Sequence, residues 1–193
     1  MPDLSRHHAV ITGGGTGIGA AIAKALQDAG ARVTIMGRRR EVLEACAAEL
    51  PGLHAVPVDV TDELSINAAM AAARDAGPVT ILVNNAGAAE TAPLARTSTA
   101  LWHRMLAVNL TGTFFCTRAV LADVMAAPGG RIINIASTSG LKGYAYTGAY
   151  AAAKHGVIGL TRTLALELAK TGATANAVCP GFAATGLVAR SLD

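Results

Sequence analysis

Short runs rich in β-branched residues alternate with longer alanine-rich segments along the chain, and this alternation constrains the fold more than any other feature. The predicted strands are residues 8–12, 32–36, 53–58, 79–85, 131–137 and 173–179. The predicted helices are residues 17–29, 39–50, 62–76, 98–126 and 148–171. Strands separated by helices of this length pair in parallel, and right-handed crossovers place the helices on both faces of the sheet. The pattern therefore predicts a doubly wound α/β domain over residues 1–193, with its ligand crevice at the carboxyl ends of the strands.

The composition indicates a globular protein and excludes several classes of partner. Of the 193 residues, 52% are hydrophobic and 15% are charged, which is enough apolar material for a large core. The 16 basic residues barely exceed the 13 acidic ones and form no long basic stripe, so we expect neither a nucleic-acid nor a membrane partner. The N-terminal "MPDLSRHH" lacks an apolar signal region, and no stretch approaches the unbroken apolar length of a membrane span.

The cysteines and histidines give no sign of a disulfide framework or a metal site. Cys46, Cys116 and Cys179 are widely spaced and odd in number. The histidines are scattered without a metal-ligand spacing. We therefore expect a soluble, cytoplasmic protein that binds no metal.

The first predicted strand runs directly into "TGGGTGIG" at residues 12–19, where a helix begins near Ile18. Gly13, Gly17 and Gly19 give the spacing GxxxGxG. Glycines let a backbone approach a pyrophosphate closely, and a helix N-terminus favours its negative charge. We interpret this segment as the phosphate-binding turn of a dinucleotide site, and a glycine-rich turn with a purely structural role is the alternative.

The second predicted strand ends in "IMGRRRE", which bears on the choice of nucleotide. Where an NAD-binding domain carries an acidic residue for the ribose 2′-hydroxyl, this chain has Gly37 followed by Arg38. Because arginine binds phosphate well, the segment favours NADP(H), with NAD(H) as the alternative. Arg38, Arg39 and Arg40 could instead be a solvated helix start. After the third strand, Asp59 either accepts a hydrogen bond from the adenine amine or caps a turn.

The segment "YAAAKHG" at residues 150–156 places Tyr150 and Lys154 four positions apart in a run of alanines. Alanine favours helix, so the two side chains should lie one turn apart on the same helical face. A lysine that merely extends to solvent beside a half-buried tyrosine is the plain alternative. The segment "NNAG" at residues 84–87 follows the fourth strand and predicts a tight backbone corner at the crevice.

Five motifs in order, "TGGGTGIG", "NNAG", "VNLTG", "INIAS" and "YAAAK", resemble the short-chain dehydrogenase/reductase family, and the resemblance runs from residue 8 to the end of the chain. It implies a Rossmann-type, NAD(P)-dependent oxidoreductase. It also implies four catalytic residues, Asn109, Ser137, Tyr150 and Lys154. The expected cofactor-binding residues are Gly13, Gly15, Thr16, Gly17, Ile18, Gly19, Arg38, Arg39, Asp59, Val60, Asn85, Ala86, Gly87, Tyr150, Lys154, Pro180, Gly181 and Thr185.

The resemblance gives the tyrosine–lysine pair a chemical role. A phenol with an ordinary pKa of about 10 is a poor acid near neutral pH. The Lys154 ammonium is expected to lower the pKa of Tyr150 and to bind the nicotinamide ribose, while Ser137 holds the substrate oxygen. The resemblance implies that Asn109 holds a water linking Lys154 to solvent. A serine hydrolase is disfavoured because the chain has no GxSxG elbow and His155 should point away.

The end of the chain departs from the family pattern. "CPGFAAT" at residues 179–185 resembles the family's PGxxxT segment, which implies that Pro180, Gly181 and Thr185 flank the nicotinamide and the phosphates. The sequence then ends at "LVARSLD", where the resembled proteins continue through a lid, a further helix and a last parallel strand. We therefore expect the lid and the C-terminal strand to be missing from this chain, truncated relative to the family.

The substrate is inferred from similarity alone. "INIASTSG" and the segment from residue 152 to residue 182 resemble bacterial ketoreductases of polyketide synthesis and 3-oxoacyl thioester reductases. The predicted reaction is reduction of such a ketone, linked to CoA or a carrier protein, with NADPH. The alternatives are an NAD-dependent alcohol, sugar or cyclic-diol dehydrogenase and a non-catalytic nucleotide-sensing protein. The apolar helices at residues 98–126 and 148–171 predict a homodimer or homotetramer.

Overall fold

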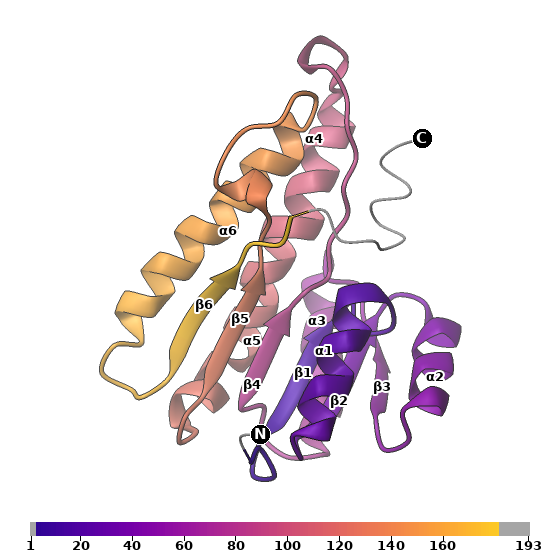
Figure 1. The fold of residues 1–193 in the computed structure, drawn as a ribbon, viewed down its shortest axis with the longest axis vertical. Coiled ribbons are helices and arrows are strands. Elements are labelled where there is room, and N and C mark those ends of the chain that lie inside the picture. The colour runs from indigo at the N-terminus through magenta and orange to yellow at the C-terminus, as the bar shows by residue number, and fades with distance from the viewer. Residues whose placement is uncertain (1–2, 182–193) are drawn as a thin grey trace.

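The computed structural model describes residues 3–181 and contains a six-stranded parallel sheet in the order β3-β2-β1-β4-β5-β6 (Figure 1). The strands are β1 (His8–Thr12), β2 (Arg32–Gly37), β3 (His54–Pro57), β4 (Ile81–Asn84), β5 (Arg131–Ile135) and β6 (Thr174–Val178). Every pair is parallel; for example, Val10 of β1 is opposite both Thr34 of β2 and Leu82 of β4. The predicted doubly wound α/β fold is confirmed, and all six predicted strands are present. β1 has the predicted bounds, β2 extends one residue further, and the other four strands are shorter than predicted.

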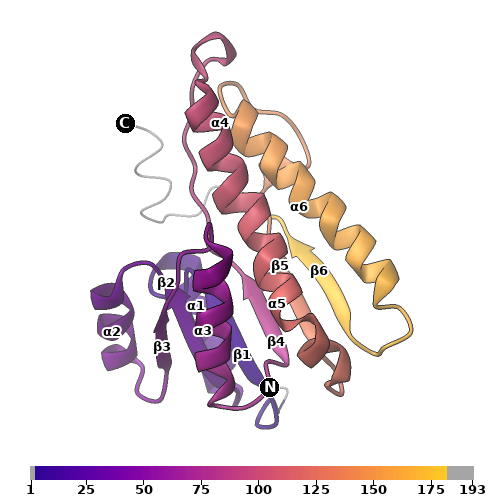
Figure 2. The ribbon, with the colours of Figure 1, turned by 180° about the vertical axis from the view of Figure 1, so that it is seen from behind.

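Helices cover both faces of the sheet (Figures 1 and 2). The helices are α1 (Gly17–Asp28), α2 (Arg40–Glu49), α3 (Glu63–Arg74), α4 (Thr99–Leu106), α5 (Gly112–Ala126) and α6 (Gly148–Glu167). One core cluster packs Ala23 of α1 and Leu43 of α2 against Ile11 and other strand residues. The other packs α3, α5 and α6 against strand residues that include Val10 and Leu82. Successive residues of β1 thus point to opposite helical layers, as expected for a strand that is buried on both faces.

The predicted helix at residues 98–126 is interrupted by a π-helical turn, η2 (Ala107–Thr111), between α4 and α5. The Asn109 Nδ2 donates to the Met105 carbonyl, which would accept the Asn109 backbone N–H in a regular α-helix. The Thr113 hydroxyl donates to the Asn109 carbonyl. Side chains therefore satisfy backbone groups where the helical ladder changes, and this turn carries the predicted catalytic asparagine.

The helical stretch Thr99–Ala126 has 28 residues and is long and apolar enough to cross a membrane by length and composition, contrary to the expectation that no stretch reaches that length. Met105, Cys116, Val120 and Val124 in this stretch are buried within the protein. A core helix of a soluble protein passes the same test, so the finding by itself does not indicate a membrane span.

Three of the predicted functional segments follow strands at one edge of the sheet. The glycine-rich segment follows β1, "NNAG" follows β4, and Ser137 follows β5. The strand order reverses at β1, which has β2 on one side and β4 on the other. At such a reversal the connections leave in opposite directions and open a crevice, so this edge is where a ligand site is expected.

Candidate active site

The glycine-rich turn after β1 has a backbone that only glycine adopts easily. Gly13 has a φ of 65° and Gly17 has a φ of 55°, both in the left-handed region. A Cβ on Gly19 would lie 2.2 Å from the Gly13 carbonyl oxygen, so α1 can approach the turn only because Gly19 lacks a side chain. The N-terminus of α1 begins at Gly17 and points its free N–H groups at this turn. The GxxxGxG spacing therefore produces a tight turn against a helix N-terminus, a geometry that suits an anion.

A cavity of about 790 Å³ opens at this turn. Its lining includes Gly13, Gly15, Thr16, Gly17, Ile18, Arg38, Arg39, Asp59, Val60, Asn85, Ala86 and Gly87, all of which are predicted cofactor-binding residues. Val42, Leu43, Val58 and Val108 also line it and were not predicted. An apolar pocket joined to a glycine-rich helix N-terminus fits the adenosine and pyrophosphate of a dinucleotide. Val58 is the last residue of the predicted third strand at residues 53–58, so including the last residue of each predicted strand would have identified it.

Arg38 and Asp59 lie at the end of the cavity formed by β2 and β3. Arg38 and Arg39 are exposed and line the cavity wall. The Asp59 Oδ1 accepts hydrogen bonds from the Thr61 backbone N–H at 2.9 Å and the Thr61 hydroxyl at 2.7 Å. These bonds lower the pKa of Asp59, and the nearby Arg38 charge adds to the effect. Asp59 thus caps a turn, as one of its two predicted roles requires, while still lining the cavity.

The segment after β4 is held against the glycine-rich turn by Thr12 and Asn85. The Thr12 hydroxyl accepts the backbone N–H groups of Asn85 and Ala86, both at 3.1 Å. The Asn85 Nδ2 donates in return to the carbonyls of Thr12 and Gly13, both at 3.0 Å. Sequence reasoning missed Thr12, although its position as the last residue of a strand that precedes a glycine turn was a usable signal.

Asn109 fixes the backbone just beyond this corner. Its Nδ2 donates to the Ala88 carbonyl at 2.9 Å, and its Oδ1 accepts the Ala88 N–H at 3.3 Å. A Cβ on Gly87 would lie 2.8 Å from the Asn109 Oδ1 and 3.8 Å from the Lys154 Nζ. The asparagine amide and the lysine ammonium therefore approach the same point of the backbone from two different helices.

Lys154 is a buried cation on α6. Only 5% of Lys154 is exposed, and its Nζ donates to the Ile135 carbonyl at 2.7 Å. Burial lowers the pKa of Lys154 to about 8. Its Nζ lies 5.7 Å from the centre of the Tyr150 ring, which agrees with the prediction that the two side chains share a helical face. A lysine that merely extends to solvent is excluded, because this ammonium is inside the protein.

Tyr150 and Ser137 interact, but the pKa of the tyrosine does not shift in the expected direction. Burial raises the pKa of Tyr150, and a side-chain hydrogen bond with Ser137 acts more weakly to lower it. The expectation that Lys154 holds the pKa of Tyr150 below its usual value is therefore wrong in this structure. The ammonium lies over the ring and donates to the Ile135 carbonyl, and burial of the phenol is the largest influence on its pKa.

The remaining predicted site residues lie around these four side chains or outside the described residues. The Pro180 carbonyl accepts the Thr138 backbone N–H at 2.9 Å, which ties the segment after β6 to the turn that follows Ser137. Gly181 is exposed at the end of the described residues, and Thr185 lies outside them. His155 is exposed with its Nδ1 2.9 Å from the Ala151 carbonyl, away from Ser137, as expected. Within residues 3–181, no group of three or more His, Cys, Asp or Glu side chains could hold a metal ion.

Comparison with known proteins connects this geometry to a family. A family model described as short chain dehydrogenase matches residues 7–193. A curated protein assigned as ketoacyl reductase 1 of the granaticin polyketide synthase from Streptomyces violaceoruber is 44% identical over 189 residues, which are 94% of this chain and 70% of that protein. A sorbitol dehydrogenase from Cereibacter sphaeroides is 42% identical over 176 residues, which are 90% of this chain and 69% of that protein.

Solved structures give the same answer for the fold. The crystal structure of a point variant of actinorhodin polyketide ketoreductase with NADPH superposes with a TM-score of 0.93 at 40% identity. The match covers 98% of this chain and 76% of that one. The sheet and the helices described above are therefore those of a known reductase fold. Identity is similar for the ketoacyl reductase and the polyol dehydrogenase, so overall similarity does not decide the substrate.

Proposed function

The chain belongs to the short chain dehydrogenase family and is an NAD(P)-dependent oxidoreductase; from this premise we propose that it reduces the ketone of a 3-oxoacyl thioester or a polyketide-like substrate with NADPH. The observation that carries the proposal is the convergence of Asn109 and Lys154 at Gly87, one helical turn from Tyr150. A buried ammonium is costly in a core, and here it lies beside a phenol at the open edge of the sheet. This arrangement supports proton transfer rather than nucleotide sensing alone.

The proposed chemistry divides the work among four side chains. NADPH, when bound, supplies a hydride to the carbonyl carbon. Tyr150 donates the proton that the resulting alkoxide requires, and the Ser137 hydroxyl holds the oxygen in place. Lys154 provides a positive charge behind the phenol below pH 8, where its ammonium form predominates. Asn109 holds the backbone at Ala88 and thereby the wall next to the reacting groups.

The preference for NADPH is supported by the charge at the β2 end of the cavity. Gly37 occupies the position where a carboxylate would contact a ribose 2′-hydroxyl, and Arg38 and Arg39 line the cavity. A guanidinium that is exposed at this wall can bind the two oxygens of a 2′-phosphate. The actinorhodin ketoreductase structure, which contains NADPH, is a neighbour at 40% identity. The NAD-dependent alternative predicts an acidic residue at this end of the cavity. The sensing alternative predicts no need for a complete set of catalytic side chains.

The substrate class is supported by the apolar character of the turn before Tyr150. Leu141, Tyr146 and Leu94 have exposed fractions of 59%, 63% and 81%, and Leu94 lies 3.9 Å from the Cβ position of Gly148. Such a rim suits an acyl chain better than a polyol, whose hydroxyls need many polar partners.

We also propose a homo-oligomer formed through α5, where Phe114 and Met125 lie eleven residues apart on one face and are 40% and 41% exposed.

Steady-state kinetics test this proposal directly. We expect kcat/KM for an acetoacetyl thioester with NADPH to exceed that with NADH, and to exceed oxidation of sorbitol or cyclohexanol with either oxidised nucleotide. Arg38→Ala should weaken NADPH binding about tenfold or more and change NADH binding less than about twofold. A preference for sorbitol would overturn the substrate class and leave the chemistry intact. Equal losses for both nucleotides would show that the arginines do not bind a 2′-phosphate.

A further inference from the structure

The chain between β4 and η1 (Leu94–Arg96) contains an irregular segment, residues 88–92, that leads away from the nucleotide cavity. The cavity lining ends at Gly87 on this side. The next residues have no helix or strand structure, so their position depends on contacts with other elements. We call residues 88–92 the connecting segment.

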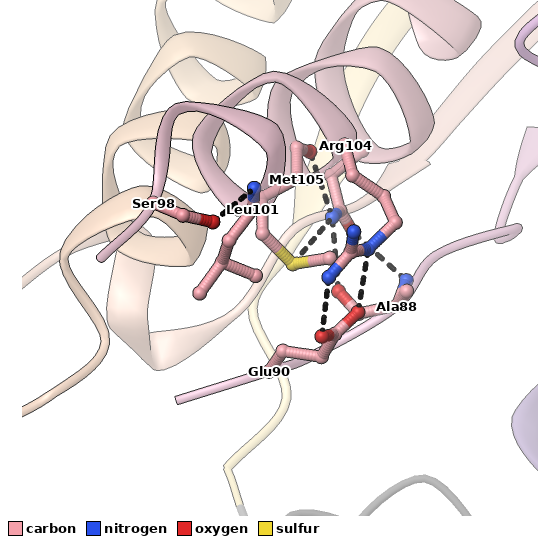
Figure 3. A network of polar contacts seen from close by, with 7 residues as sticks. Ala88, Glu90, Ser98, Leu101, Arg104 and Met105 are labelled. Atoms are coloured by element: carbon pink, nitrogen blue, oxygen red, sulfur yellow. Dashed lines mark hydrogen bonds and ion pairs between the residues drawn. The ribbon is translucent and has the colours of Figure 1, made fainter. Parts of the chain in front are cut away.

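Contacts hold the connecting segment at alternate residues. Ala88 exchanges two hydrogen bonds with the Asn109 side chain on η2. Ala92 donates its N–H to the Tyr146 carbonyl at 2.8 Å, in the turn that leads into α6. Between them, the Glu90 carboxylate receives two hydrogen bonds from Arg104 of α4, at 2.9 Å from Nε and 2.6 Å from Nη2 (Figure 3). Two of the three attachments therefore belong to α4 and the π turn that follows it.

The element that provides Arg104 is itself well anchored. The Ser98 hydroxyl caps α4 by accepting the Leu101 N–H at 3.1 Å (Figure 3). Met105, the neighbour of Arg104, is fully buried and its carbonyl accepts from Asn109. The backbone at Arg104 is therefore held in place. Because the guanidinium donates two hydrogen bonds to the Glu90 carboxylate, the contact restricts the orientation of Glu90 as well as its distance from α4.

The ion pair contributes little to folding, which makes a positional role the better explanation. The side chains of Arg104 and Glu90 are 49% and 46% exposed, and exposed pairs contribute little to stability because water screens them. The pair does fix the middle of a segment whose backbone is hydrogen-bonded only at its ends, at Ala88 and Ala92. At the far end, Tyr146 has a φ of 68°, a conformation that a non-glycine residue keeps only when its surroundings hold it.

The connecting segment joins groups on both sides of the proposed ketone site. At one end it contacts Asn109 beside Lys154, and at the other it contacts the turn four residues before Tyr150. We propose that Glu90 and Arg104 are positioning residues that hold this segment as a wall of the ketone site, an inference that rests on the proposed reductase function. Loss of the pair lets the wall move without disturbing the nucleotide cavity, which ends at Gly87.

Kinetics of Glu90→Gln and Arg104→Gln test the positional role. We expect KM for the thioester ketone to rise about threefold to tenfold in each variant, while kcat and the NADPH Kd change less than about twofold. Glu63→Gln is the matched control, because Glu63 pairs with Arg118 between two other helices and the two side chains are 48% and 49% exposed. The control should leave KM unchanged. In the exchanged double variant, Glu90→Arg with Arg104→Glu, KM should return part of the way toward the wild-type value.

Hydrogen–deuterium exchange of the intact protein tests the same contact independently of activity. Peptides that cover residues 88–92 should exchange faster in Glu90→Gln than in wild type or in Glu63→Gln. Unchanged exchange would overturn the proposed attachment, and faster exchange with unchanged KM would overturn its role in the ketone site. A wild-type protein that reduces no ketone would disprove the proposed function, and faster exchange would then support the attachment and overturn the role in catalysis.

Discussion

Polar side chains are buried at both ends of the strands, which we call the amino edge and the carboxyl edge of the sheet, but their hydrogen bonding differs. At the amino edge, His8 begins β1 with 1% exposure, and both of its ring nitrogens have partners: the Gly77 carbonyl at 2.9 Å and the Thr34 hydroxyl at 2.8 Å. The Thr80 hydroxyl accepts the His8 backbone N–H at 3.0 Å. At the carboxyl edge, Lys154 is buried with a hydrogen bond to the Ile135 carbonyl.

The difference separates polar groups that stabilise the fold from polar groups that are available for chemistry. The His8 ring is neutral and saturated by hydrogen bonds, since burial lowers its pKa, and such a group fits a core at little cost. Lys154 keeps an ammonium in a buried place, and burial lowers its pKa to about 8. Costly ionisable groups at the open edge of a sheet are typical of sites that act on a ligand. Three substitutions test this contrast.

The largest expected effect is at the carboxyl edge, on turnover. Tyr150→Phe removes the proposed proton donor and its interaction with Ser137, and leaves the glycine-rich turn intact. We expect kcat to fall about 10²-fold to 10⁴-fold, with NADPH Kd within about twofold of wild type. Stopped-flow reduction and nucleotide fluorescence titration measure the two quantities. Near-normal turnover would remove Tyr150 from the mechanism.

The sequence predicted the strands, the glycine-rich turn and the pairing of Tyr150 with Lys154, because these depend on local patterns of two to four residues. It did not predict the π turn at Asn109 or the direction of the pKa shift of Tyr150. Both depend on groups distant in the chain: Ala88 faces Asn109 across twenty-one residues, and burial by the assembled fold sets the phenol pKa.

The contact between Glu90 and Arg104 was missed for a related reason. The two residues are fourteen positions apart and belong to a loop and a helix, so no periodic pattern relates them. The arginines at residues 38–40 follow a predicted strand, and this position predicted a ligand contact. Arg104 instead has the pattern of an ordinary exposed residue of an amphipathic helix. Irregular segments take their positions from such contacts, and sequence patterns do not report them.

The second effect is at the amino edge, on stability. His8→Leu leaves the Gly77 carbonyl and the Thr34 hydroxyl without their partner, which should cost about 1–3 kcal/mol of unfolding free energy. Because this cluster is at the opposite end of β1 from the glycine-rich turn, kcat/KM should stay within about twofold. Urea unfolding and steady-state kinetics on the same preparation measure both. A large loss of activity in a folded variant would contradict the separation of the two edges.

The pH dependence of stability offers a check on the same residue. Burial lowers the pKa of His8; the hydrogen bond to the Gly77 carbonyl opposes this effect, and the charges of Arg32 and His54 add to it. A group whose pKa is lower in the folded state contributes stability that is present above its unfolded pKa of about 6.5 and is lost as the pH falls through the folded value. Wild type should therefore lose stability below pH 6.5 more steeply than His8→Leu does. Parallel curves would show that the histidine is not the group responsible.

The smallest expected effect is a gain in stability from removing the buried cation. Lys154→Met replaces an ammonium whose pKa burial lowers to about 8 with an apolar chain of similar length, but leaves the Ile135 carbonyl without its donor. The two terms oppose each other, and we expect a net gain of about 1 kcal/mol at pH 7, or about 2–4 °C in Tm, together with loss of turnover. The unfolded lysine holds its proton to about pH 10.5, so wild-type stability should rise between pH 8 and that value and the gain should shrink. A variant that is less stable than wild type at pH 7, or a difference that does not change with pH, would show that Lys154 supports the fold as His8 does.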